Sequence, residues 1–203
     1  MKEILAPGAA VLRGLASSID GALLASVQEV SAQSPFRHMI TPGGYRMSVA
    51  TTNCGALGWV TDRSGYRYDP ADPQSGERWP PMPASFLELA KEAAARAGFD
   101  AYFPDACLIN RYQPGARLSL HQDRNERDMR QPVVSVSLGI PAVFLFGGLK
   151  RSDKALRVPL SHGDVVVWGG PSRLRFHGVN PLKAGDHRML DGCRINLSFR
   201  KAG

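Results

Sequence analysis

The chain has 203 residues and a formal net charge of +7. Its 43% hydrophobic and 21% charged residues are typical of a globular protein, and exclude a disordered, collagen-like or coiled-coil chain. No apolar run approaches the roughly 20 residues that cross a bilayer, and the N-terminus lacks the apolar core of a signal peptide. We therefore expect a single domain over residues 1–203, located in the cytoplasm and not in a membrane.

Positive charge is concentrated in the second half of the chain. Residues 1–100 hold 9 Lys/Arg and 10 Asp/Glu, whereas residues 101–203 hold 16 and 8. A basic half favours an anionic partner such as nucleic acid, although a merely solvated basic surface explains the same excess.

The three cysteines are Cys54, Cys107 and Cys193. Their odd number and wide spacing argue against a disulfide framework or a structural zinc site. We expect three buried thiols.

Two helices are predicted in the N-terminal half. The first follows Ser17 or Ser18, either of which can serve as its N-cap. Its apolar residues recur at helical spacing and are Ile19, Leu23, Val27 and Val30. The second runs from about Pro83 to Ala97 and ends at Gly98, because Pro favours a helix start and Gly the position after its end.

The segment over residues 55–83 differs from its surroundings. It follows a strand predicted over 46–54 and carries aromatic residues among Gly, Pro, Asp and Arg. These aromatic residues are Trp59, Tyr66, Tyr68 and Trp79. We expect a loop-rich insertion with one hairpin, whose aromatic rings form either a small satellite core or a stacking surface.

The remainder of the chain is predicted to consist of short strands. A first one covers 9–12, and eight more cover 106–112, 117–122, 133–139, 142–146, 156–160, 164–168, 173–178 and 193–200. Eight short strands at this spacing indicate a sandwich or barrel, of which the jelly roll is the natural eight-stranded form. The predicted class is mainly β (α+β), with the two helices covering one sheet.

A candidate metal site begins at His121 and Asp123. Strand alternation places both side chains on one face, where they can bind one ion, and His177 at the end of a later strand is the best third ligand. Two His and one carboxylate leave open positions on Fe(II), as in non-haem iron oxygenases. The His-x-Asp pair alone is unspecific, and the same donors suit a zinc hydrolase or a polar surface pair.

The last predicted strand has one polar and one apolar face. The polar face holds Arg194, Asn196, Ser198 and Arg200, and the apolar face holds Ile195, Leu197 and Phe199. This pattern fits either an edge strand with a wet face or a cavity that holds a dianion, because arginine binds carboxylates bidentately. Asn110 and Tyr112 share a face of an earlier strand and could donate to the same ligand.

Together these segments resemble the AlkB family of iron(II)- and 2-oxoglutarate-dependent dioxygenases, its bacterial alkylation-repair members in particular. The matching segments, in the family's order, are SPFR (34–37), TPGGY (41–45), LGW (57–59), PDACLINRY (104–112), LSLHQD (118–123), VSVSLG (134–139), FGGLKR (146–151), HGDVVVWGG (162–170) and the RxNxxxR tail (194–200). The resemblance covers nearly the whole chain. It implies a double-stranded β-helix, which is a jelly roll, with N-terminal helices, a nucleotide-recognition lid over about 41–70 and a catalytic core over about 104–203.

The resemblance also assigns roles. It makes His121, Asp123 and His177 the catalytic iron ligands. It places 2-oxoglutarate against Asn110, Tyr112, Arg194, Asn196 and Arg200. It places the substrate against Trp59, which stacks on the damaged base, and against Tyr66, Ser119, Arg124, Asn125 and Arg151. Asn125 stands where the family has an Asp that helps to read the exocyclic amine of the base, so the resemblance leaves the balance between methylated adenine and cytosine open. Arg124 replaces an expected Lys, which keeps the charge but not the geometry.

The implied activity is direct reversal of alkylation damage. Fe(II), 2-oxoglutarate and O2 are the implied cofactors, and formaldehyde leaves as 2-oxoglutarate becomes succinate and CO2. The expected substrates are bases such as 1-methyladenine and 3-methylcytosine in single-stranded DNA, with double-stranded DNA and RNA as further candidates, and we expect a monomer. The alternatives are a dioxygenase directed at tRNA or protein, and a jelly roll that binds single-stranded nucleic acid without catalysis.

Overall fold

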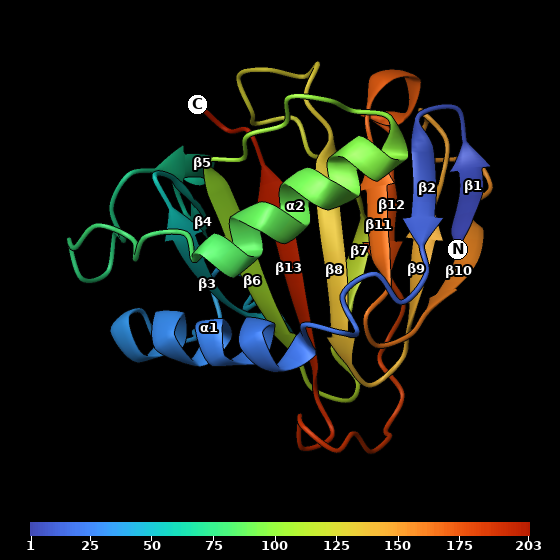
Figure 1. The fold of residues 1–203 in the computed structure, drawn as a ribbon. Helices are drawn as coiled ribbons and strands as arrows, with labels where there is room; N and C mark the ends of the chain where they lie inside the picture. Colours follow the sequence, from blue (N-terminus) through green and yellow to red (C-terminus); the bar gives the residue numbers. More distant parts are fainter.

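Two antiparallel sheets form the centre of the molecule (Figure 1), a computed structural model that describes residues 1–203. The elements are β1 (Lys2–Ala6), β2 (Ala9–Leu12), α1 (Asp20–Gln33), β3 (Ala50–Gly55), β4 (Gly58–Asp62), β5 (Gly65–Asp69), α2 (Ala84–Ala97), β6 (Ala106–Tyr112), β7 (Leu118–His121), β8 (Val133–Gly139), β9 (Ala142–Phe146), β10 (Leu156–Leu160), β11 (Val165–Trp168), η1 (Gly170–Ser172), β12 (His177–Val179) and β13 (Arg194–Arg200). The seven-stranded sheet has the order β1-β2-β11-β8-β13-β6-β3, and the four-stranded sheet has the order β10-β9-β12-β7. This arrangement confirms the predicted jelly roll.

Both helices lie across one face of the seven-stranded sheet (Figure 1). The apolar face of β13 packs against them, and the Phe86 ring of α2 meets the Phe199 ring edge-on at a centroid distance of 5.8 Å. The second core fills the space between the two sheets and includes Phe144, Phe146 and Trp168. The polar face of β13 is thereby left for the interior between the sheets.

The strand β13 lies in the middle of its sheet and not at an edge. It pairs with β8 on one side and β6 on the other, and all seven of its residues are buried. The reading of an edge strand with a wet face is therefore wrong. Polar side chains on a fully buried central strand have to find partners or a ligand inside the protein.

The predicted insertion contains the hairpin β4–β5, a separate two-stranded sheet. Trp79 packs behind it with Val60 and Met39 as a small satellite core. A Cβ at Gly58 would lie 2.4 Å from the Trp79 ring, so this close packing requires glycine there. The satellite core is confirmed for Trp79, whereas Tyr66 is 49% exposed and lies outside it, so the stacking surface stays a prediction.

Four departures from the sequence prediction have an identifiable cause. The helix α1 has Ile19 and not a serine at its N-cap, because the preceding residues form turns tied to the loop before β11 through the Ala16 N–H and the Gly163 carbonyl. The strand β3 begins only at Ala50, since the Met47 N–H bonds to the carbonyl of Met39 instead. Arg173 and Leu174 continue the turn after η1, so the strand expected over 173–178 starts too early, and β12 begins only at His177. The edge strand β1 lacks an alternating pattern and was not predicted.

The three cysteines are buried, as expected. No helix is long and apolar enough to cross a membrane.

Candidate metal and cosubstrate site

The three predicted metal ligands converge at one end of the four-stranded sheet. His121 ends β7 and His177 begins β12, and the two residues are direct partners in the ladder between these strands. Asp123 follows β7 by two residues, and its carboxylate oxygens lie 3.7 Å from the Nε2 atoms of both imidazoles. One ligand atom from each residue lies within 4.8 Å of the others, so a single ion can bind all three.

Hydrogen bonds to the backbone orient both imidazole rings. The Nδ1 of His121 lies 2.8 Å from the Ser119 carbonyl, and the Nδ1 of His177 lies 3.1 Å from the Arg175 carbonyl. A carbonyl only accepts, so each Nδ1 carries the proton and each Nε2 keeps its lone pair toward the site. Burial, reinforced by His121, lowers the pKa of His177 to about 3, so this ring is a neutral ligand near pH 7.

Asp123 is held by the two arginines that flank it. The Nε and Nη2 of Arg200 donate to Oδ2 at 2.8 and 2.7 Å, and Nη1 of Arg173 donates to the Asp123 carbonyl at 2.7 Å. Burial alone raises the pKa of Asp123, but Arg200 and the two imidazoles outweigh it and lower the pKa below its usual value. The ionised carboxylate thus turns Oδ2 to Arg200 and keeps Oδ1 for a metal.

Arg194 is a buried cation with no acidic partner. Its residue is 1% exposed, its Nη2 donates to the Ser137 hydroxyl at 2.9 Å, and its Nε and Nη1 have no hydrogen-bond partner. Tyr112 lies directly opposite it in the β13–β6 ladder, and the guanidinium sits 4.9 Å from the centroid of that ring. A buried guanidinium with free N–H groups is costly unless an anion such as a carboxylate binds there.

The predicted amides lie side by side in the same sheet. Asn110 and Asn196 are ladder partners, and the Asn110 amide lies 3.4 Å from the Asn196 oxygen. The Nδ2 of Asn196 donates to the Ser135 hydroxyl and the Val136 carbonyl, both at 2.8 Å. The Asn196 amide is therefore occupied by contacts within the protein. The Asn110 amide makes only one long hydrogen bond and is more available to a ligand.

The hairpin presents two aromatic rings from one face. Trp59 and Tyr66 stack with centroids 5.8 Å apart and planes inclined by 22°. The buried amide of Asn53 on β3 clamps the backbone of Trp59, donating to its carbonyl and accepting from its N–H, both at 3.0 Å. Asn53 was not predicted as a site residue, because the residues around an amide in a strand do not indicate that its side chain binds the backbone of the next strand.

The other predicted substrate contacts lie at the surface near the metal ligands. Ser119, Arg124 and Asn125 are exposed and lie within four residues of Asp123 or His121 along the chain. Arg151 is exposed and its guanidinium lies 5.9 Å from the Phe176 ring, next to His177 in sequence. Their contacts with a substrate stay a prediction.

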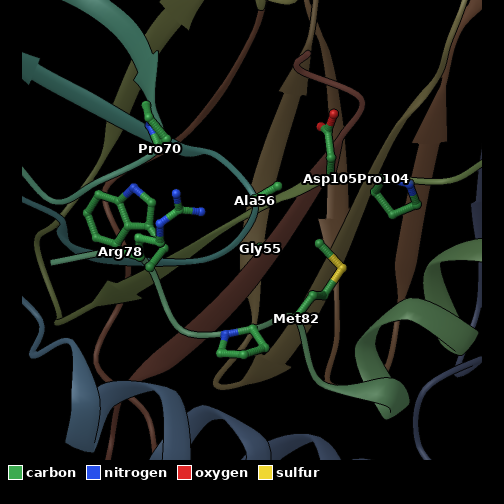
Figure 2. Close-up of a pocket in the computed structure, with 9 residues that line it drawn as sticks. Gly55, Ala56, Pro70, Arg78, Met82, Pro104 and Asp105 are labelled. Atoms are coloured by element: carbon green, nitrogen blue, oxygen red, sulfur yellow. The ribbon is translucent and has the colours of Figure 1, made fainter.

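A separate cavity of about 430 Å³ lies between the base of the hairpin and the start of β6 (Figure 2). It is lined by Gly55, Ala56, Pro70, Arg78, Trp79, Pro81, Met82, Pro104 and Asp105. None of these is a predicted site residue, and Asp105 already binds Lys201 and the N–H groups of Ala202 and Gly203. The cavity therefore adds nothing to the metal and cosubstrate site.

Comparison with known proteins agrees with this geometry. Residues 8–200 match the family model of the 2OG-Fe(II) oxygenase superfamily. The chain is 59% identical to the alpha-ketoglutarate-dependent dioxygenase AlkB of Escherichia coli K12, over 100% of this chain and 94% of that protein. It is 44% identical to the AlkB homolog of Caulobacter vibrioides NA1000, over 97% and 88%.

A solved structure and a more distant relative extend the comparison. The structure of OsALKBH1 superposes with a TM-score of 0.86 at 30% identity, over 99% of this chain and 100% of that one. The human nucleic acid dioxygenase ALKBH1 is 34% identical over 61% of this chain and 31% of its own length. With a near full-length match to the family model and to AlkB relatives, the chain belongs to the 2OG-Fe(II) oxygenase superfamily and, within it, to the AlkB family of alpha-ketoglutarate-dependent dioxygenases.

Proposed function

We propose that this protein removes N-methyl groups from damaged bases of nucleic acid by oxidative demethylation. Two relatives with near full-length coverage are named alpha-ketoglutarate-dependent dioxygenase AlkB, and a more distant one is named nucleic acid dioxygenase. The overall conversion consumes one 2-oxoglutarate and one O2 for each methyl group. It yields succinate, CO2, formaldehyde and the unmethylated base.

The unpaired Arg194 is the observation that carries this proposal. A buried guanidinium whose Nε and Nη1 have no hydrogen-bond partner fits the distal carboxylate of 2-oxoglutarate, with Tyr112 beside it. The ligands His121, Asp123 and His177 fit Fe(II), since two neutral imidazoles and one carboxylate leave positions open for further ligands. The residues present therefore fit both the metal and the cosubstrate.

The protein's own residues bind and orient. When bound, Fe(II) with 2-oxoglutarate supplies the activation of O2 and the oxidation of the methyl carbon. Trp59 provides a flat aromatic surface on which an extruded base can stack, and a cationic methylated base strengthens that contact. The backbone carbonyls that hold the Nδ1 atoms keep both imidazoles turned toward the metal. Arg200 keeps Asp123 ionised and fixed in one orientation.

We infer that the preferred substrate is single-stranded DNA carrying 1-methyladenine or 3-methylcytosine. The methylated Watson–Crick edge weakens pairing, so that extrusion of the damaged base costs less than extrusion of an intact one. Arg124 and Arg151 are exposed, and such cations suit a phosphate backbone. We further propose a monomer that works in the cytoplasm as one domain over residues 1–203, with the lid at 41–70 and the core at 104–203.

Two other readings are less consistent with the site. A zinc hydrolase has the same three donors but gives no role to the buried Arg194. A binding module without catalysis does not need a metal triad whose imidazoles are oriented by the backbone.

The proposal is tested by following succinate by NMR. Purified protein with Fe(II), 2-oxoglutarate and O2 receives either a 3-methylcytosine oligonucleotide or the same unmethylated sequence. Succinate formation should be faster with the methylated strand and absent in the Asp123→Ala variant. Equal rates with both strands would leave a dioxygenase whose substrate lies elsewhere.

A further inference from the structure

One of the predicted metal ligands, Asp123, belongs to a buried quartet of charged side chains. It consists of Asp123, Glu126, Arg173 and Arg200, each 3% to 9% exposed. Arg200 binds Asp123, and its Nε lies 3.4 Å from the Glu126 carboxylate. Arg173 pairs with Glu126 at 3.0 Å while it donates to the backbone of Asp123. The two positive charges balance the two negative ones, so removing any one member leaves a buried charge without a partner and lowers the free energy of unfolding.

The hairpin β4–β5 touches this quartet through Tyr68. The hydroxyl of Tyr68 on β5 donates to Oε1 of Glu126 at 2.6 Å. Tyr68 is also the direct ladder partner of Trp59 on β4, so both side chains stand on the same face of the hairpin. Burial raises the pKa of Tyr68 well above its usual value, so the hydroxyl keeps the proton that it donates.

A continuous chain of contacts therefore runs from the hairpin to the metal ligand. It passes from Trp59 across the ladder to Tyr68, then through Glu126 and Arg200 to Asp123. We propose that Tyr68 is a positioning residue that couples the docking of a methylated base on the hairpin to the binding of metal and 2-oxoglutarate at Asp123. This inference rests on the proposed function, and it adds a role for a side chain outside the predicted iron, 2-oxoglutarate and substrate residues.

Thermodynamic linkage makes the coupling measurable. If metal and cosubstrate favour the hairpin position in which Tyr68 reaches Glu126, they tighten nucleic-acid binding by a factor that also applies in reverse. Removing the Tyr68 hydroxyl breaks the chain without changing the ring, the metal ligands or the stacking surface. The variant should therefore lose the coupling and keep the nucleic-acid affinity of the metal-free protein.

The experiment measures the affinity of a fluorescent oligonucleotide carrying one 3-methylcytosine by anisotropy. Each protein is titrated metal-free and again with Co(II) plus 2-oxoglutarate, since Co(II) occupies such sites without turnover under anaerobic conditions. Tyr68→Phe is compared with wild type. The matched control is Tyr102→Phe, which removes a tyrosine hydroxyl that is buried but has no hydrogen-bond partner.

We expect wild type and Tyr102→Phe to bind the methylated strand at least about 5-fold more tightly when Co(II) and 2-oxoglutarate are present, within the usual range of coupling. In Tyr68→Phe this ratio should fall below about 2-fold. A ratio preserved in Tyr68→Phe, or lost equally in the Tyr102→Phe control, would overturn the inference. The wild-type titrations are repeated with the same strand lacking the methyl group. Equal affinities for the two strands would instead count against the proposed function.

Hydrogen exchange of the wild-type protein provides a test that needs no variant. Adding Co(II) and 2-oxoglutarate, without nucleic acid, should slow amide exchange in β5 around Tyr68. Protection confined to the metal ligands and β13, with exchange in β5 unchanged, would also overturn the coupling.

Discussion

The guanidinium of Arg194 lies 4.9 Å from the ring centroid of Tyr112, its partner across the ladder between β13 and β6. Two of its nitrogens, Nε and Nη1, have no hydrogen-bond partner in the protein. Burial lowers the pKa of Arg194 from its usual value, and only the polar neighbour Tyr112 opposes this effect. The sheet thus holds a cation whose natural partner is an external anion. The other arginine of the strand, Arg200, is already paired with Asp123.

Replacing Arg194 should have opposite effects on the affinity for 2-oxoglutarate and on the stability of the metal-free protein. We expect Arg194→Met to weaken 2-oxoglutarate binding to the Co(II)-loaded protein by at least about 30-fold, because breaking a buried charge pair costs about 2 kcal/mol or more. The metal-free protein should gain stability on the order of 1 kcal/mol, since an unpaired buried charge is replaced by an apolar chain of similar length. Calorimetric titration and urea unfolding measure the two effects. A variant that binds 2-oxoglutarate normally would remove Arg194 from the cosubstrate site.

The metal ligands should differ in their structural cost. His121→Ala and Asp123→Ala are both expected to abolish turnover and Co(II) binding. His121 has a partly exposed side chain, so its loss should change the free energy of unfolding by less than about 1 kcal/mol. Loss of Asp123 leaves Arg200 without its main partner and should cost about 3–5 kcal/mol. Near wild-type turnover by either variant would contradict the iron assignment, and equal unfolding free energies would contradict the role of the buried pair.

Trp59 should matter for the base and not for the cosubstrate. In Trp59→Ala we expect turnover of 3-methylcytosine DNA to fall by at least about 10-fold, since base–aromatic stacking contributes about 1–3 kcal/mol per base. Decay of 2-oxoglutarate without nucleic acid should stay within about 2-fold of wild type, because Trp59 lies on the hairpin. Equal losses in the two assays would show that Trp59 supports the catalytic core instead of holding the base.

An ion pair anchors the segment after the hairpin and should make stability depend on pH. Burial raises the pKa of Asp72, but the hydrogen bonds from Arg37 and the Gln74 N–H outweigh it and lower the pKa from 3.8. The unfolded chain therefore binds a proton at higher pH than the folded one, and the contribution is complete above the unfolded pKa and lost as pH falls through the folded value. Urea unfolding of wild type and Asp72→Asn should differ by about 1–3 kcal/mol at pH 6, and the difference should vanish as the pH falls through the lowered pKa of Asp72. A difference independent of pH would exclude Asp72 as the titrating group.

Much of the fold could be predicted from local patterns. Alternation in β13 separated Ile195, Leu197 and Phe199 from the polar face correctly, because the side-chain period of a strand is two wherever it lies. The sequence could not say whether that polar face meets water or the interior. Only the pairing of β13 between β8 and β6 decides this, and such pairing joins segments far apart in the chain.

The supporting residues of the site show the same limit. The metal ligands follow from a short motif and a later histidine, and the structure brings them together. The burial of Glu126 and Arg173 could not be predicted from the sequence, because charged residues in loops are normally solvated. Their positions depend on contacts among the loop after β7, the turn after η1 and the end of β13. Local propensity and periodicity carry no information about such contacts.

The central claim is direct oxidative demethylation, and mass spectrometry of a substrate strand tests it most directly. A short single-stranded DNA with one 3-methylcytosine is incubated with the protein, Fe(II), 2-oxoglutarate and air, beside a mixture without 2-oxoglutarate. We predict that the strand loses the mass of one CH2 unit, because hydrogen replaces the N-methyl group, only in the complete mixture. A strand of unchanged mass in the complete mixture, with protein shown to be loaded with metal, would contradict the account.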